Sequence, residues 1–319
     1  PVAKSRPGAE SVLADFAPDG TTLAVAMESG EIVWRESATG SELGSTSLGD
    51  SEFRGDLRKL ACLDETRAIA LEEPGILWLV PATGFADWLS EETIEDFGAF
   101  GDSGRLIAVN GEATFEIEVG DPVVSRKVDA GSKLVWTDAD SLEYGLVVEN
   151  QAGGFDLVVR TFGGRANLKL PLQGEPSRVL AFANRTLAYT DVNGDIWILN
   201  LDTKTSNRLA DSGGDWNCLS LSRDGKALLA FSSLGILAAW ETSTGRQKFR
   251  NEPRVSGMLG AGFTSGSRGI YLVPDGSRIF YSDDALGGGI DDLSVGFTIA
   301  SVELSPAGDI YLVCGEQGE

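Results

Sequence analysis

Carboxylates are the side chains that could do chemistry in this sequence, since it holds 48 Asp and Glu residues and no histidine. Without histidine, a Ser-His-Asp or Cys-His nucleophilic mechanism cannot operate, and the commonest transition-metal ligand is missing. A glycosidase needs only two carboxylates at a defined separation, but the sequence singles out no such pair. We therefore expect no catalysis within this chain and no cofactor.

One group of acids surrounds a glycine run in "SDDALGGGIDD", which contains Asp283, Asp284, Asp291 and Asp292. Clustered carboxylates from a loop are ligands that Ca²⁺ accepts, so a cation site is conceivable here. The spacing matches no EF-hand pattern, and we expect a solvated surface loop without a metal.

The overall negative charge indicates which classes of binding partner the chain disfavours. The formal net charge is −22, from 48 acids against 26 bases. Such a surface repels phosphate backbones and anionic lipids, so we expect neither nucleic-acid binding nor membrane insertion. No apolar run approaches the roughly 18 residues that a membrane helix needs. A basic protein partner, or solubility alone, fits the charge better.

The acids are unevenly distributed, because no Lys or Arg lies between Arg67 and Arg105 or after Arg278. The first zone holds eight acids: Glu72, Glu73, Asp87, Glu91, Glu92, Glu95, Asp96 and Asp102. Two hypotheses follow: an acidic sector that docks a basic partner, or a generally acidic surface that serves solubility.

Within this zone, "DWLSEETIEDFGAF" departs from strand periodicity. Ser followed by two Glu residues is a helix-start signal, which predicts a short helix in a surface loop. The candidate partner-binding residues are Trp88, Glu91, Glu92, Glu95, Asp96 and Phe97. The alternative is that both aromatic side chains pack in the core.

The elements that must position these residues follow a repeat. Polar turns between two apolar runs occur near Gly20, Glu65, Ser103, Asp140, Asn184, Asp224, Gly266 and Ala307. They lie about 37 to 45 residues apart, the period of four-stranded propeller blades. The fold class is therefore all-β, with strands that are short and apolar because sheets pack on both faces.

A second marker supports the repeat. A Gly opens the third strand of six units, as in "GEIVW", "GILWL" and "GDIWIL", and Gly276 is the candidate for a seventh. A Trp follows three to five residues later in four units. Gly permits the positive φ of a tight turn, and the Trp side chain fills the space between neighbouring sheets. We expect Trp34, Trp78, Trp197 and Trp240 to be buried at equivalent positions.

Two stretches carry a family resemblance: "FAPDGTTLAVAMESGEIVWRESATGSEL" and "LSRDGKALLAFSSLGILAAWETSTGRQKF". Both resemble WD40-type repeats in their Asp-Gly turn, Gly-x-Ile or Gly-Ile third strand and Trp before a Thr-Gly turn. "FAPDGTTLAV" is also similar to the repeats of the TolB propeller. The Gly-His and Trp-Asp dipeptides of WD40 repeats are absent, so the hydrogen-bond network that the family builds on them cannot form here.

The predicted architecture is one β-propeller domain over residues 1–319, made of four-stranded antiparallel blades. Eight blades are favoured and seven are the alternative. Their approximate bounds are 8–50, 51–90, 91–128, 129–172, 173–211, 212–253, 254–298 and a partial unit at 299–319.

By resemblance, the chain is expected to be a non-enzymatic protein-interaction platform, a domain of a larger protein or a subunit of a complex. The alternatives are a periplasmic envelope-assembly propeller, or a carboxylate- or cation-dependent enzyme that uses the propeller channel. Cys62, Cys218 and Cys314 lie far apart in apolar surroundings, which predicts buried thiols and a reducing compartment. We expect a cytoplasmic location, with the periplasm as the alternative.

Overall fold

The computed structural model describes residues 11–27, 29–48, 57–73, 75–82, 84, 86–90, 92–129, 132–138, 141–209, 214–232, 236–251, 258–263, 270–274, 278–282, 291–294, 299–304 and 311–315. These residues form antiparallel strands and one short 3-10 turn, η1 (Gly101–Ser103). By contacts the chain separates into two compact units, residues 1–148, 158–169 and 303–319 in the first and residues 149–157 and 170–302 in the second.

Three complete sheets belong to the first unit. The first sheet is β1 (Ser11–Phe16), β2 (Thr22–Met27), β3 (Glu31–Glu36) and β4 (Glu42–Ser47). The second is β5 (Leu57–Cys62), β6 (Arg67–Glu72), β7 (Ile76–Pro81) and β8 (Asp87–Trp88). The third is β9 (Asp96–Ala99), β10 (Arg105–Asn110), β11 (Ala113–Glu118) and β12 (Val124–Asp129).

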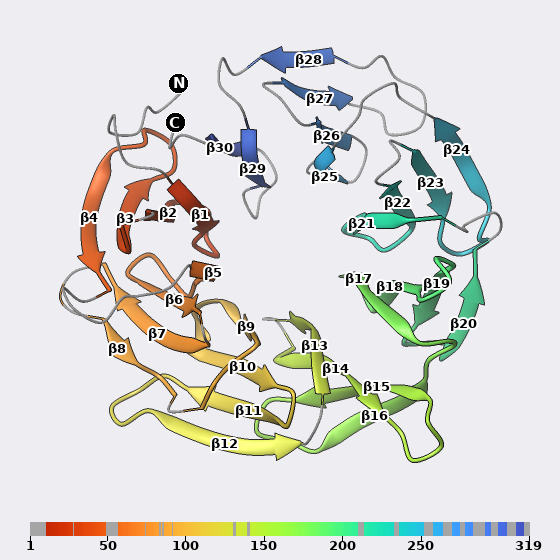
Figure 1. The fold of residues 1–319 in the computed structure, drawn as a ribbon, viewed down its shortest axis with the longest axis horizontal. Coiled ribbons are helices and arrows are strands. Elements are labelled where there is room, and N and C mark those ends of the chain that lie inside the picture. The colour runs from red at the N-terminus through yellow and green to blue at the C-terminus, as the bar shows by residue number, and fades with distance from the viewer. Residues whose placement is uncertain are drawn as a thin grey trace. The chain divides into compact units, whose positions relative to one another are not determined.

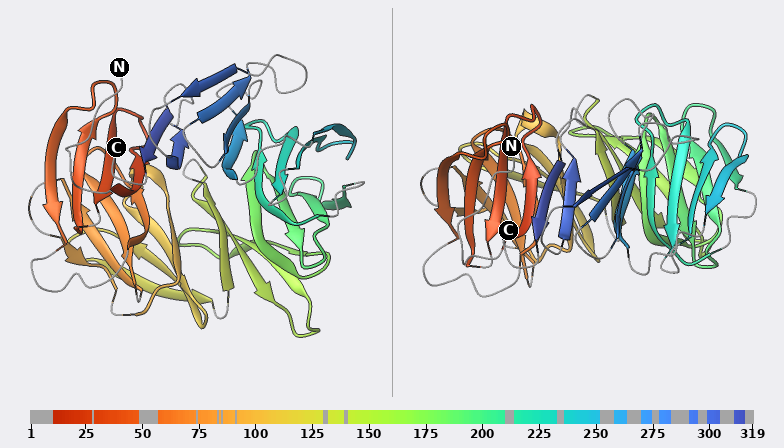
Figure 2. Two further views of the ribbon diagram at one scale, coloured as in Figure 1. Left: turned by 45° about the horizontal axis from the view of Figure 1, so that its top comes forward. Right: turned by 90° about the horizontal axis from the view of Figure 1, so that it is seen from above.

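A fourth sheet has strands in the order β13 (Ser132–Asp138), β14 (Glu143–Glu149), β15 (Phe155–Thr161) and β16 (Ala166–Pro171). In the first unit the first strands of successive sheets are neighbours, so that β1 contacts β5, β5 contacts β9 and β9 contacts β13. The sheets of β1–β4 and β5–β8 lie side by side in all views (Figures 1 and 2). The late strand β30 (Tyr311–Gly315) contacts β1.

The second unit repeats the same meander. Its sheets are β17 (Pro176–Ala183), β18 (Thr186–Asp191), β19 (Ile196–Asn200) and β20 (Thr205–Arg208), then β21 (Trp216–Leu221), β22 (Ala227–Ser232), β23 (Leu237–Glu241) and β24 (Gln247–Asn251). A further sheet is β25 (Met258–Phe263), β26 (Ile270–Pro274), β27 (Arg278–Ser282) and β28 (Asp291–Ser294). The strand β29 (Ile299–Leu304) pairs with β30 in a two-stranded sheet.

Burial explains why these segments read as apolar runs. The second strands β2, β6, β10 and β18 are buried along nearly their whole length, because neighbouring sheets cover both of their faces. The fourth strands β4 and β20 are mostly exposed, as expected for the edge of each sheet.

The repeated spacing of Trp after Gly places three of the four Trp side chains in the core. Trp34 and Trp240 are fully buried and Trp78 is 4% exposed, whereas Trp197 is only partly buried. The core cluster between the first two sheets joins Trp34 and Trp78 with small side chains such as Ala24 and Ala70. The expectation of four buried Trp side chains is therefore confirmed for three, and Trp197 departs from it.

Candidate functional site

The candidate partner-binding residues lie on β8, on β9 and in the loop that joins them. The predicted helix does not form: the described residues on either side of Glu91 are extended or bent. The Leu89 amide donates to the Leu77 carbonyl at 2.9 Å, and the Ile94 amide donates to the Gly75 carbonyl at 2.9 Å. Leu89 and Ile94 are both buried in the core, and a helical turn would withdraw one of them.

Glu91 lies outside the described residues. The Ser90 hydroxyl oxygen accepts a hydrogen bond from the Glu92 amide at 3.1 Å, which is the local contact that the helix-start signal predicts. No helix follows this contact among the described residues, because Leu89 and Ile94 pack into the core between sheets.

Phe97 and Asp96 make contacts within the first unit. Phe97 is fully buried, so the alternative expectation of a core position fits this side chain. Lys59 from β5 donates to the Asp96 carboxylate at 2.7 Å and to the Phe97 carbonyl at 2.6 Å, and its ammonium lies 5.2 Å from the Phe97 ring centroid. The charge of Asp96 is therefore balanced within the chain.

Trp88 behaves differently, with 55% of the residue exposed. It lies directly opposite Trp78 in the register of β7 and β8, and the two rings meet edge to face at 5.7 Å. The Trp78 indole in turn donates to the buried carboxylate of Glu72 at 2.9 Å. The Trp88 ring is thus largely exposed to solvent while its edge-to-face contact with Trp78 fixes its position.

Exposed carboxylates accompany Trp88. Asp87 precedes it on β8, and Glu92 and Glu95 follow in the loop. The Glu95 carboxylate accepts a hydrogen bond from the Gly111 amide at 3.0 Å, which brings the exposed Glu112 of the β10–β11 turn to the same end of the unit. We call these five residues, Asp87, Trp88, Glu92, Glu95 and Glu112, the β8–β9 surface.

Within the described part of the chain, none of the four acids of the β8–β9 surface has an ion-pair partner. The nearest bases in sequence on β5 are already engaged, Arg58 with Glu73 at 3.5 Å and Lys59 with Asp96 at 2.7 Å. The sequence supplies no base between Arg67 and Arg105. Among the described residues, the charge of these four acids is therefore not neutralised by an ion pair.

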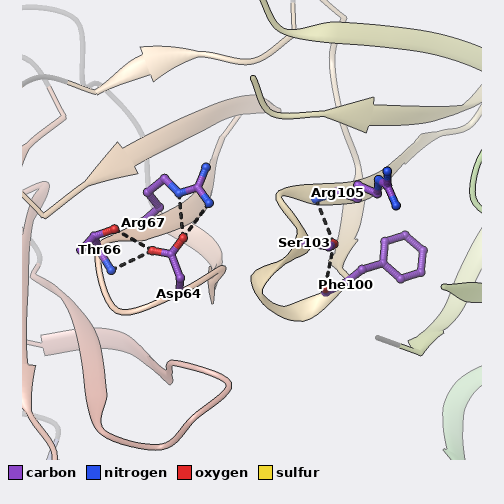
Figure 3. A network of polar contacts seen from close by, with 6 residues as sticks. All are labelled: Asp64, Thr66, Arg67, Phe100, Ser103 and Arg105. Carbon is purple, nitrogen blue, oxygen red and sulfur yellow. Dashed lines mark hydrogen bonds and ion pairs between the residues drawn. The ribbon is translucent and has the colours of Figure 1, made fainter. Parts of the chain in front are cut away.

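In the turns between β5 and β6 and between β9 and β10, in contrast to the unpaired acids above, the polar groups bind one another (Figure 3). Arg67 pairs with Asp64 at 2.7 Å, and the Thr66 amide and hydroxyl also donate to this carboxylate. Partial burial works against ionisation, but the hydrogen bonds from Arg67 and Thr66 hold the pKa of Asp64 below its ordinary value. In the next sheet, the Ser103 hydroxyl donates to the Phe100 carbonyl at 2.8 Å.

A buried carboxylate ties the third sheet to the fourth. Glu116 on β11 accepts hydrogen bonds from the Tyr144 hydroxyl at 2.7 Å, from the Gly163 amide at 3.0 Å and from Arg126. Burial and the neighbouring carboxylate of Glu116 raise the pKa of Tyr144 above its ordinary value. Because these three donors fix the Glu116 carboxylate in place, we assign Glu116 a structural role.

Of the four acids around the glycine run, the structure describes two. Asp283 and Asp284 lie outside the described residues, and Asp291 and Asp292 lie on β28, opposite Tyr281 and Phe280 in register. Among the residues that the structure describes, no group of three or more His, Cys, Asp or Glu side chains could hold a metal ion. In the same residues, no helix is long and apolar enough to cross a membrane.

Comparison with solved structures identifies the fold. The chain is similar to the Dos1 propeller, with a TM-score of 0.75 and 10% sequence identity over 98% of this chain and 92% of that one. It is also similar to Sqt1 of Saccharomyces cerevisiae, with a TM-score of 0.70 and 12% identity over 98% of this chain and 95% of that one. No family model and no curated protein sequence matches the chain. At these identities the likeness shows the fold alone: the chain is an all-β protein with the β-propeller fold.

Proposed function

We propose that this chain is a non-enzymatic protein-interaction platform and that its β8–β9 surface docks a basic segment of a protein partner. The observation that carries the proposal is Trp88, a solvent-exposed ring that meets Trp78 edge to face. It belongs to a stretch of chain whose exposed acids have no ion-pair partner among the described residues. Exposed Trp side chains are over-represented among the residues that dominate protein interfaces. Fold analogy also favours an interaction role, since propellers offer rigid surfaces on which different sites are built.

Charge complementarity specifies the partner. Asp87, Glu92, Glu95 and Glu112 attract a basic segment and steer its approach, with an effect that decays over about 8 Å at physiological ionic strength. A cytoplasmic location and eight blades remain predictions from the sequence.

The test is a charge reversal that leaves internal contacts intact. Glu92→Lys combined with Glu112→Lys changes two exposed acids, whereas Asp96 and Glu95 are spared because they bind Lys59 and the Gly111 amide. We expect a short synthetic peptide of alternating Arg and Gly to bind the double variant at least about fivefold more weakly, mainly through a slower on-rate. Surface plasmon resonance at two salt concentrations measures both rates.

The matched control is Glu149→Lys combined with Glu175→Lys, since both residues are exposed acids elsewhere and the change in net charge is identical. The control variant should bind the peptide nearly as the unmodified protein does. If the two double variants lose affinity equally, the acids act only through net charge and the docking proposal fails.

A further inference from the structure

Elsewhere in the first unit, two aromatic rings, one buried and one partly buried, each lie under a cation that a carboxylate also binds. The Arg105 guanidinium lies 5.4 Å from the Phe162 ring centroid and pairs with Glu118 at 3.2 Å. Lys59 lies over Phe97 in the same way and pairs with Asp96. In both places the ring and the carboxylate act together on one cation, as cation–π geometry within about 6 Å allows.

Trp88 has the ring but not the cation. Its ring meets Trp78, whereas Asp87 lies opposite Leu79 in the register and so faces the other side of β8. Among the described residues no Lys or Arg lies over the Trp88 ring, and the bases of β5 are engaged with Glu73 and Asp96. Among the described residues, the most exposed large aromatic side chain is thus one that no Lys or Arg covers.

We infer that Trp88 stacks on the guanidinium of an arginine side chain from the partner, which the negative charge of this part of the chain attracts. This inference deepens the proposed function and rests on it. Arginine fits better than lysine, because its planar group is weakly hydrated and stacks on an aromatic face while its N–H groups still reach a carboxylate. Trp is also the aromatic side chain that gives the strongest cation–π contact.

The experiment compares three synthetic peptides of equal length, in which Gly alternates with Arg, Lys or citrulline. Isothermal titration measures their affinity for the unmodified chain, for Trp88→Ala and for Trp88→Phe. We expect the Arg peptide to bind more tightly than the Lys peptide and the citrulline peptide to bind weakly. Trp88→Ala should weaken the Arg peptide roughly two- to sixfold and abolish the preference for Arg, while Trp88→Phe should keep part of it.

Leu43→Ala is the matched control, since Leu43 is 57% exposed on the fourth strand of the neighbouring sheet. A second measurement is the indole N–H resonance of Trp88 in a ¹⁵N–¹H spectrum, assigned by its loss in Trp88→Phe. Added N-acetylarginine amide should shift this resonance more than N-acetyllysine amide does.

The outcomes separate this inference from the docking proposal. If Arg and Lys peptides bind equally, or if Trp88→Ala keeps the Arg preference, the stacking inference is overturned. In that case a loss of binding in the Glu92→Lys and Glu112→Lys variant would still support docking by charge alone. If none of the peptides binds the unmodified chain, both proposals fail.

Discussion

At the scale of single residues, buried carboxylates bind two of the repeated Trp side chains. The Trp78 indole donates to Glu72 at 2.9 Å, and the Trp197 indole donates to Asp191 at 3.1 Å. In each pair the acid lies six residues before the Trp, at the end of the second strand. A direct bond from indole to carboxylate needs no histidine, so Trp78 and Trp197 are each held in their sheet without one.

Asp15 is the residue whose protonation the structure sets apart. Its carboxylate accepts a hydrogen bond from the Cys62 amide at 2.8 Å at the junction of β1 and β5. Burial raises the pKa of Asp15 to about 6, although the hydrogen bonds from the Cys62 and Phe16 amides oppose the shift. The same burial raises the pKa of the Cys62 thiol, so this Cys is expected to react slowly in the folded chain.

The sign of the resulting pH dependence follows from linkage. A carboxyl with a raised pKa binds its proton more tightly in the folded chain, so its contribution to the free energy of unfolding increases as pH falls through about 6. The gain levels off below the unfolded pKa of about 4. Between pH 7 and pH 5 this group should add about 1 kcal/mol.

Urea unfolding of the unmodified chain and of Asp15→Asn at both pH values checks this number. The difference in stability between the two proteins should change by about 1 kcal/mol, because Asn has no proton to gain. A pH dependence identical in the two proteins would show that Asp15 ionises as an ordinary surface acid.

At the scale of elements, the turn between β6 and β7 is tightly constrained. Gly75 has φ +127°, and a Cβ atom there would lie 2.6 Å from the Ile94 carbonyl oxygen and 2.6 Å from the Thr93 methyl group. This turn supports the β8–β9 surface, because the Gly75 carbonyl accepts the Ile94 amide. In the fourth sheet, Gly153 also has a positive φ, +78°, but no atom lies within 4 Å of its Cβ position.

The two glycines therefore form a matched pair. Gly153→Ala should cost about 1 kcal/mol of unfolding free energy from the left-handed backbone alone. Gly75→Ala should cost more, roughly 3 kcal/mol, since it adds a clash with backbone to a conformation essentially reserved for Gly. Denaturant unfolding of both variants measures the difference, and equal losses would mean that the loop after β8 moves freely away from the turn.

At the scale of the whole molecule, the net charge of −22 is the dominant long-range feature. Ion pairs such as Arg67 with Asp64 and Arg126 with Glu116 neutralise a minority of the acids. The remaining negative charges repel one another in the compact state more than in the expanded unfolded chain. Screening by salt should therefore stabilise the fold.

We expect the melting temperature to rise as NaCl increases from about 0.01 M to about 0.15 M, because the screening length falls from about 30 Å to about 8 Å. Differential scanning calorimetry at constant pH measures the shift. A melting temperature that falls over this range would mean that local ion pairs outweigh the general repulsion.

The repeat could be predicted from the sequence because its signals are local. Turn residues such as Asp19-Gly20 and Asn184-Arg185, the alternation of apolar runs and the spacing of Trp after Gly each depend on neighbours within one hairpin. These signals determined the strands, their order within each sheet and the propeller fold. They also placed Trp88 and the acidic zone in one loop region.

Whether each candidate residue is buried, exposed or paired was decided only by the tertiary structure. The helix that the signal at Ser90 predicts does not form, because Leu89 and Ile94 are buried in the core instead. Their burial depends on a neighbouring sheet, which cannot be predicted from the local sequence. Phe97 and Trp88 look alike in sequence, yet one is fully buried and the other is 55% exposed. Lys59 neutralises Asp96 across 37 residues of chain, and Glu95 reaches the Gly111 amide across 16. Contacts between distant residues follow from how sheets pack, and this packing decides which acids lack an ion-pair partner among the described residues.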